Sequence, residues 1–207
     1  MPNRNRSAFL TLTAVAAGLL AGCATPTWDA TPGTHHSEKT GLTLDVPSGW
    51  SRYGDPREIV LTRDGFLLNL IRIKRTPYGE KYGDTELTLR AEMSQLDASQ
   101  LVVESMQADQ KRRNLVLIDN QPVTVAGHPG FRVEVSYRNE DNLTVHEIIY
   151  VALIPEAYLV ALCRAPERHY IEAVSGDFER VVASLRLDTD LPAAADNLND
   201  PRMIRSR

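Results

Sequence analysis

Residues 131–137 alternate between apolar and polar side chains, and this period of two constrains the fold more than any other feature of the sequence. Such a period is typical of a β-strand that buries one face and leaves the other wet or only partly covered. Turn sequences at 139–142 and 155–157 separate this run from two further apolar runs, at 143–154 and 158–164. Three runs joined by short turns predict an antiparallel meander of three strands.

The remaining segments predict further strands and two helices. Residues 66–73 are apolar on both faces for much of their length, so we expect this strand to lie centrally and to be covered on both sides. Asp97, with Gln100 three residues later, predicts the capped start of a helix over 98–112, in which Met106 fills the core. The other predicted elements are strands over 42–46, 59–61, 115–118 and 123–125, a turn at 120–122 and a second helix over 170–185.

The N-terminal segment is typical of an export signal. Basic residues precede an apolar run over 8–20 that is too short to span a bilayer, since a spanning helix needs roughly 20 apolar residues. The run ends at residues 20–23 in Leu-Ala-Gly-Cys, which resembles the lipobox of bacterial lipoproteins. This resemblance implies cleavage between Gly22 and Cys23, and a diacylglycerol on the Cys23 sulfur. The alternative is an ordinary secretory signal with an incidental cysteine.

These boundaries predict the organisation of the chain. Residues 1–22 form the signal peptide, and residues 23–40 comprise the lipidated cysteine and a flexible tether that is rich in Thr, Pro, Gly and Ala. The folded domain covers 41–187. Residues 188–207 show neither period nor apolar mass, which predicts a disordered tail. Two or three acyl chains on the cysteine make the attachment to the membrane effectively permanent.

Charge and cysteine content narrow the class of protein. Removal of residues 1–22, which contain two arginines and no acidic residue, takes the formal net charge from −4 to −6. An acidic domain without a basic stripe does not fit a nucleic-acid-binding protein. Cys163 is the only cysteine besides Cys23, so no intrachain disulfide can form once Cys23 is acylated. The apolar neighbours of Cys163 predict a buried, unreactive thiol.

Motifs for catalysis or metal binding are missing from the sequence. Residues 146–150, His-Glu-Ile-Ile-Tyr, come nearest to a zinc-protease motif, but a tyrosine replaces the second histidine and the segment alternates like a strand. His35 and His36 have no nearby cluster of ligands and are expected to be solvated. We therefore expect no catalytic residues, no metal and no cofactor.

Residues 76–96 predict a long loop, and a long loop on a compact domain is a candidate contact surface. Its segment 78–84 contains two glycines, two tyrosines and no regular period. Tyr78 and Tyr82 are candidate binding residues, since tyrosine is enriched in binding hot spots. The alternative is that both rings pack back onto the sheet. The next candidate surface is the wet face of the first meander strand, with Arg132, Glu134 and Arg138.

Four short segments carry a family resemblance. They are the strand over 42–50 that ends in Val-Pro-Ser-Gly-Trp, the segment Ala-Gly-His-Pro-Gly-Phe-Arg at 126–132, the strand at Tyr158, and the last helix over 178–186. With them, the domain over 41–187 resembles the PsbP-like family of photosystem extrinsic proteins, a yeast Ran-binding import factor and bacterial lipoproteins of the DcrB type. The resemblance implies an α+β fold, in which helices cover both faces of a central antiparallel β-sheet (an α/β/α sandwich), and usually no enzymatic activity. Motifs for Ran binding or photosystem docking are missing, so it implies no partner.

The functional hypothesis combines these expectations. We expect a membrane-anchored lipoprotein of the cell envelope that serves as a non-enzymatic binding or assembly-support module for an envelope protein. The residue after the lipidated cysteine is Ala24 rather than an aspartate, which by resemblance favours the periplasmic face of the outer membrane. The alternative is a weak hydrolase or a small-ligand-binding periplasmic protein. A hydrolase would need a pocket that joins His128, His146 or His169 to a serine and a carboxylate.

Overall fold

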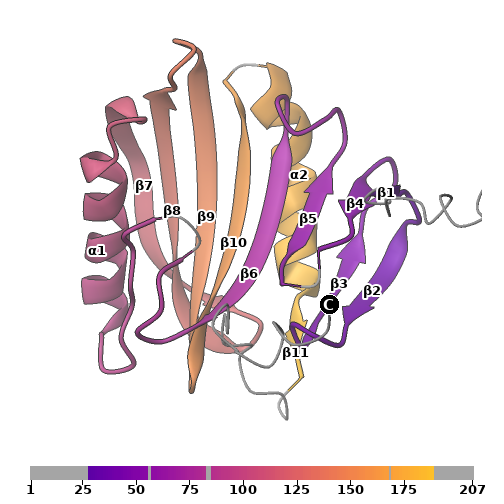
Figure 1. Cartoon of the computed structure of the whole chain (residues 1–207), viewed down its shortest axis with the longest axis horizontal. Helices are drawn as coiled ribbons and strands as arrows, with labels where there is room; N and C mark the ends of the chain where they lie inside the picture. Colours follow the sequence, from indigo (N-terminus) through magenta and orange to yellow (C-terminus); the bar gives the residue numbers. More distant parts are fainter. Residues whose placement is uncertain (1–27, 56, 83–84, 168, 189–207) are drawn as a thin grey trace, which may run out of the picture.

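A computed structural model describes residues 28–55, 57–82, 85–167 and 169–188, except for the side chain of His169 (Figure 1). The predicted signal peptide, the cleavage and lipidation site at Gly22 and Cys23, and the predicted tail from residue 189 onward lie outside the described residues.

The largest element is an eight-stranded antiparallel β-sheet. Its strands are β1 (Trp28–Asp29), β4 (Ser51–Tyr53), β5 (Ile59–Thr62), β6 (Leu70–Pro77), β7 (Arg113–Val125), β8 (His128–Arg138), β9 (Thr144–Ile154) and β10 (Ala157–Pro166). They lie in the order β1-β4-β5-β6-β10-β9-β8-β7, so β1 and β7 form the two edges of the sheet. The consecutive pairing of β8, β9 and β10 confirms the predicted meander. The position of β6 between β5 and β10 confirms that it is a central strand.

A smaller sheet contains β2 (Gly33–Ser37), β3 (Leu42–Val46) and β11 (Arg186–Leu187), with β3 in the middle. The structure corrects the predicted tether here, because β2 pairs with the whole of β3 and β1 pairs with β4. The sequence of β2 has no apolar period, and it forms a strand because β3 offers a backbone edge to pair with. The described fold therefore begins at Trp28 rather than at residue 41.

Two helices complete the fold: α1 (Gln95–Ala108) and α2 (His169–Ser184). The prediction for α1 started and ended too late, because Ser94 and not Asp97 is the N-cap. The Ser94 hydroxyl accepts a hydrogen bond from the Asp97 N–H at 3.2 Å and donates one to the Asp97 carboxylate at 2.7 Å. Asp97 lies in the first turn, where a negative charge is favoured by the helix dipole. Within the described chain, neither helix is long and apolar enough to cross a membrane.

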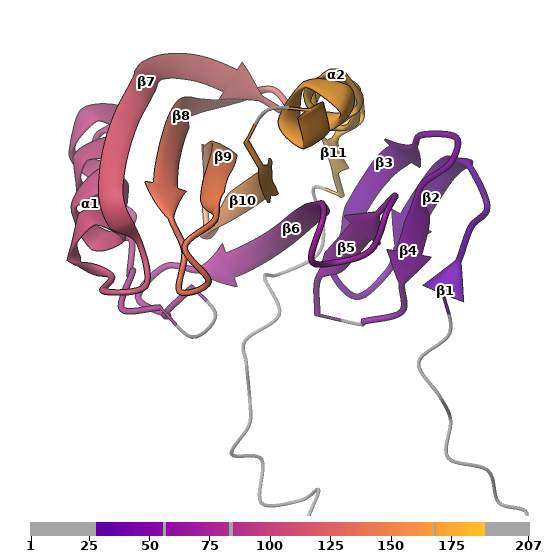
Figure 2. The ribbon, with the colours of Figure 1, turned by 90° about the horizontal axis from the view of Figure 1, so that it is seen from above.

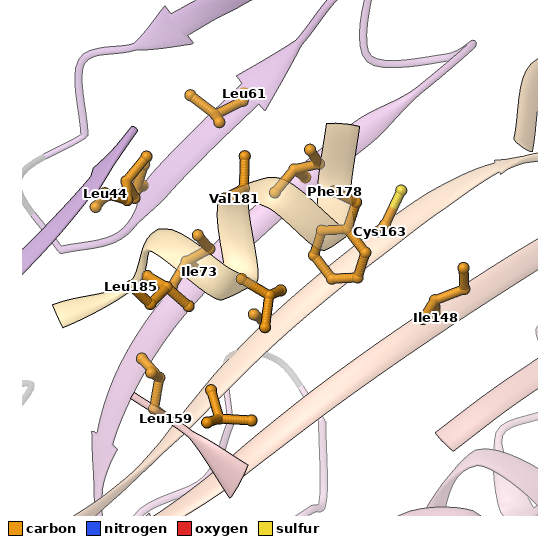
Figure 3. Close-up of a cluster of buried hydrophobic side chains, with 14 of the residues drawn as sticks. Leu44, Leu61, Ile73, Ile148, Leu159, Cys163, Phe178, Val181 and Leu185 are labelled. Carbon is orange, nitrogen blue, oxygen red and sulfur yellow. The ribbon is translucent and has the colours of Figure 1, made fainter. Parts of the chain in front are cut away.

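The two helices cover opposite faces of the large sheet, as Figure 2 shows. Alternating residues of β9 show the division, since Ile148 packs in the α2-side core and Ile149 in the α1-side core. This arrangement confirms the predicted α+β class with helices on both faces. Residues of the α1-side core include Val102, Met106, Phe131 and Val133. Residues of the α2-side core include Leu44, Ile73, Leu159, Phe178 and Val181 (Figure 3).

Two buried residues of the α2-side core were singled out by the sequence. Trp50, which ends the Val-Pro-Ser-Gly-Trp segment, is fully buried, and its indole N–H donates to the Asp177 carboxylate of α2 at 2.8 Å. This bond ties the chain after β3 to the last helix. Cys163 is fully buried beside Phe178, and burial raises the pKa of its thiol (Figure 3). The prediction of a buried Cys163 is confirmed.

The structure corrects the start of β6. The strand begins at Leu70, not at Phe66, because residues 66–68 form a turn in which the N–H groups of Leu68 and Asn69 both donate to the carbonyl of Gly65. Phe66 is left partly exposed by this turn.

The structure also corrects the predicted turn at 120–122. β7 is one continuous edge strand with two irregularities in its register, and it contains Pro122. Proline is tolerated on an edge strand because its missing N–H can face away from the ladder. The hairpin to β8 turns at Ala126 and Gly127, which have φ angles of 49° and 80°. Positive φ at both central residues is the requirement of a type I′ hairpin turn.

Candidate functional site

The loop with the predicted binding tyrosines folds back onto the sheet. Tyr82 is buried in the α1-side core with Leu87 and Leu89, and its backbone N–H donates to the carbonyl of Leu87 at 2.9 Å. Its hydroxyl is buried without a hydrogen-bond partner among the described residues, and burial raises its pKa. The candidate binding residue Tyr82 is therefore buried, and its ring fills the core.

Tyr78 is half-buried, and its ring centroid lies 5.9 Å from that of Tyr158. The Tyr158 hydroxyl donates to the carbonyl of Glu80 at 3.0 Å, which ties the loop to β10. Burial raises the pKa of Tyr158 to about 12. Both tyrosines of the loop thus pack back onto the sheet, as the alternative interpretation had it, and they do not share an exposed surface.

The polar face of β8 carries a network of charges that neutralise one another. The Arg132 guanidinium contacts the carboxylates of Asp119 and Glu134 at 3.0 Å and 2.5 Å, and it lies over the ring of Tyr150. His146 contacts the other Glu134 oxygen at 2.7 Å. Burial raises the pKa of Glu134, but its bonds to Arg132 and His146 outweigh this and hold the pKa below its usual range. These charges stabilise the sheet face that packs against α2, and they leave little uncompensated charge for a partner.

Among the described residues, no serine joins His146 and a carboxylate in a hydrolytic arrangement. Ser136 lies opposite His146 in the strand register, but no hydrogen bond joins their side chains in the described chain. His128 lies at the other end of β8, and the side chain of His169 is outside the description. The cavities described below are not lined by histidine, and the described residues contain no group of three side chains placed to hold a metal ion.

A buried glutamate on the other sheet face was missed by the sequence reasoning. Glu147 of β9 is fully buried and accepts a hydrogen bond from the Tyr137 hydroxyl at 3.0 Å. Arg112 lies 3.4 Å from one carboxylate oxygen and Arg164 3.9 Å from the other. The available signal was the position of Glu147 between Val145 and Ile149, on the inward face of an apolar strand.

Arg112 joins this glutamate to the end of α1. It also pairs with Asp109 at 2.5 Å, and its guanidinium lies over the Tyr137 ring at 5.4 Å. Burial lowers the pKa of Arg112, but Glu147, Tyr137 and Asp109 together raise it by more, so the pKa lies above its ordinary value. The pKa of Tyr137 is raised, mainly because its hydroxyl is buried and next because of the nearby Glu147 charge. The arrangement is a buried ion pair in which the Arg112 Nε has no hydrogen-bond partner among the described residues, and it favours a structural role.

A cavity of about 260 Å³ opens above this cluster. This volume is below the roughly 300–1,000 Å³ of typical small-molecule sites. Its charged lining is mixed, with Lys111, Arg112 and Arg164 against Asp109, Glu140 and Asp141. A second cavity, of about 370 Å³, lies between the start of α1 and β7 and is lined by Leu96, Asn120, Pro122 and Phe131 among others.

The exposed large hydrophobic residues of the described chain fall into two groups. The β7-edge surface consists of Leu96, Val116, Leu117 and Ile118. The loop-end surface consists of Trp28, Phe66, Leu67 and Leu143. Exposed apolar patches mark contact surfaces more often than single apolar residues do. The register pairs Val116 with Ser136 and Leu117 with Val135, so these two side chains lie on opposite faces of the sheet at its edge. Sequence reasoning missed both surfaces, since it assigned most of these residues to buried strands or to the tether.

Comparisons with known proteins identify the fold. No protein-family model matches the sequence, and no curated protein matches it. Among solved structures, the cyanobacterial PsbP protein CyanoP of Synechocystis matches with a TM-score of 0.53 and 16% identity, over 83% of this chain and 100% of CyanoP. The chain has the PsbP/Mog1-like fold.

A second solved structure with the PsbP/Mog1-like fold is the Saccharomyces cerevisiae Ran-binding protein Mog1p. It matches with a TM-score of 0.50 and 11% identity, over 77% of this chain and 96% of Mog1p. LpqN, which is involved in cell envelope biogenesis of Mycobacterium tuberculosis, matches with a TM-score of 0.49 and 14% identity, over 76% of this chain and 90% of LpqN. The fold assignment rests on the first two, and at these identities the likeness concerns the fold alone.

Proposed function

We propose that this protein is a lipoprotein of the cell envelope, anchored through Cys23, whose domain is a non-enzymatic module that binds an envelope protein through the β7-edge surface. The periplasmic face of the outer membrane is the proposed location, because Ala24 follows the cysteine. The observation that carries the binding role is the exposure of three consecutive apolar residues, Val116 to Ile118, on an edge strand of 13 residues.

An edge strand presents unpaired backbone groups and is a ready surface for another chain. Here, however, the register of β7 is interrupted on both sides of the pair Val116 and Leu117, and Pro122 lacks an N–H. Bulges and proline are devices that blunt strand addition. A partner therefore docks on the apolar side chains of the β7-edge surface. The cavity beside Leu96 can receive an apolar side chain of that partner.

The absence of an assembled catalytic group within the described residues supports a binding role rather than hydrolysis. Anchoring supports it further, because restricting a domain to a layer near the membrane raises its effective concentration for partners in that layer. A contact surface of modest size and modest affinity is then sufficient for binding a partner in that layer.

Site-specific photocrosslinking in cells tests the proposal. A photoreactive residue in place of Leu117 should give one crosslinked adduct of defined mass, and Val116→Asp combined with Ile118→Asp should abolish it without unfolding the domain. Leu143→Asp is the matched control, because Leu143 is similarly exposed but lies at the loop end. The proposal is wrong if the Leu117 adduct is missing, or if the adduct survives the two aspartates on a folded domain.

A further inference from the structure

The loop-end surface is a built feature of the fold and not the tip of a loose loop. Asn69 is almost fully buried, and its side-chain oxygen accepts hydrogen bonds from the Thr62 hydroxyl at 3.1 Å and from the Arg63 N–H at 2.7 Å. Its amide donates to the Asp64 carboxylate at 2.6 Å. These bonds hold the β5–β6 connection in one conformation. In that conformation Leu67 is 93% exposed, more than any other large hydrophobic residue described.

Aromatic rings extend this surface towards β1. The ring of Trp28 lies 4.8 Å from that of Phe66 and 5.4 Å from that of Tyr53. Three rings in mutual contact form one cluster, yet Trp28 and Phe66 remain 44% and 43% exposed. Each of these two rings therefore keeps part of its apolar surface uncovered by the described domain. Tryptophan and tyrosine with one apolar and one wet side are the residues enriched at membrane–water interfaces.

The surface continues across the cavity to the β8–β9 connection. Phe66, Leu67 and Leu143 all line the 260 Å³ cavity. The strand registers place the β5–β6 and β8–β9 connections at the same end of the sheet, at the top of Figure 1. Three basic and three acidic side chains line the cavity, so net charge does not select an anionic ligand. The apolar residues are the feature that distinguishes this end.

The length of chain before β1 restricts what this surface can face. Only residues 24–27 separate Cys23 from Trp28. An extended chain spans at most about 3.5 Å per residue, so five residue steps hold Trp28 within about 18 Å of the lipidated cysteine. A bilayer is about 40–45 Å thick in total, and its hydrocarbon core is about 30 Å thick. The headgroup region on each side is therefore several ångströms thick. Trp28 therefore lies within reach of the interface in any orientation of the domain.

We propose that the loop-end surface rests on the bilayer, with Trp28, Phe66 and Leu67 among the lipid headgroups, and that it thereby orients the domain. The proposal rests on the lipid anchor at Cys23, which is part of the proposed function. It commits to the membrane as the occupant, because the short connection brings the bilayer and not a particular protein to this surface. β1 and β7 are opposite edges of the sheet, so this orientation leaves the β7-edge surface directed away from β1 and accessible.

Tryptophan fluorescence of the full lipidated chain in vesicles tests the contact. Phosphatidylcholine brominated close to its headgroup should quench Trp28 but not Trp50, because Trp50 is fully buried in the domain. Trp28→Phe should remove the quenching. Since the contact is apolar, raising the salt concentration should not weaken it. Equal emission in brominated and unbrominated vesicles would overturn the proposal.

A single-site probe provides a second readout. Leu67→Cys introduces an accessible thiol, since Cys163 is buried and Cys23 is acylated in the proposed protein. A polarity-sensitive dye at this site should shift to blue in vesicles of phosphatidylcholine alone. The matched control is Leu96→Cys, because Leu96 is also well exposed. Leu96 lies at the other end of the sheet, where the side chain of the neighbouring Gln95 donates to the carbonyl of Gly130. The emission of the dye at this control site should not shift.

The outcomes separate this inference from the proposed function. A shift at Leu67 that needs added envelope protein would mean that a protein covers the surface, and it would overturn the membrane contact. Loss of membrane attachment in Cys23→Ser tests the anchor alone. A protein that stays anchored and gives the Leu117 crosslink, but shows no shift at Leu67, refutes the orientation and leaves the proposed function intact.

Discussion

The buried pair of Glu147 and Arg112 should show strong energetic coupling. Removing one partner of a buried ion pair costs about 3–5 kcal/mol, because the other charge is left without compensation. Glu147→Leu leaves Arg112 with Asp109 at 2.5 Å, so we expect a loss near the low end, about 3 kcal/mol. Arg112→Met leaves the fully buried carboxylate with Tyr137 and with Arg164 at 3.9 Å, and we expect about 4 kcal/mol.

The double variant, Glu147→Leu with Arg112→Met, should lose less than either single variant. An apolar pair of similar volume avoids burying charge, so the main remaining cost is the Tyr137 hydroxyl that has lost its acceptor, about 1–3 kcal/mol. The cycle of four proteins isolates the coupling between the two side chains.

Urea denaturation of the chain from residue 23, carrying Cys23→Ser, measures these losses. A change of about 3 kcal/mol moves the midpoint by about 1–2 M urea for a domain of this size. Lys81→Ala is the control, because its 2.6 Å pair with Glu86 is exposed and should contribute less than about 1 kcal/mol. Losses that add up in the double variant, to about 7 kcal/mol, would refute the assignment of Glu147 and Arg112 as one coupled unit.

Three further predictions concern single residues. Tyr82→Phe should raise the free energy of unfolding by about 1 kcal/mol, because it removes a buried hydroxyl without a described partner. Tyr82→Ala should lower the free energy of unfolding by about 3–5 kcal/mol, because it empties a buried ring site. If urea denaturation finds both variants neutral, the ring lies outside the core. Cys163 should react with a polar thiol reagent far more slowly in the native domain than in denaturant, because burial raises its pKa, and equal rates would contradict its burial. The pKa of Asp29 should be about 2 rather than 3.8, because the Thr31 side chain, the Thr31 N–H and Arg52 bond to its carboxylate. The contribution of these bonds to folding stability is present above pH 3.8 and is lost as the pH falls through 2. An ordinary pKa for Asp29 in carboxyl NMR would show that this attachment of β1 is not formed.

The sequence by itself determined the elements whose signal is local. The alternation of residues 131–137 identified β8 and its buried face, and the turns at 139–142 and 155–157 gave the meander. Apolar residues on both faces identified β6 as a central strand, although its start was predicted four residues too early. Hydrophobic period and turn chemistry act over a few residues, so one sequence is sufficient to read them.

Boundaries failed where two local signals compete. Ser94 and Asp97 are both good N-caps, and the sequence alone does not rank them; the packing of α1 on β8 selects Ser94. Pro122 predicted a turn, but it lies in a strand because β7 is at the edge of the sheet, which is a property of the whole topology.

Only the tertiary structure decided the surfaces and the buried ion pair. Gly33–Ser37 becomes β2 because β3 offers it an edge, and Tyr82 is buried because its loop packs into the α1-side core. Glu147 meets Arg112, which is 35 positions away in the chain, only once β9 and the end of α1 are packed together. A period reports which side of an element is apolar, but not which distant element will cover it. Exposure, pairing and charge compensation depend on contacts between residues far apart in the sequence, and these contacts exist only after the chain has folded.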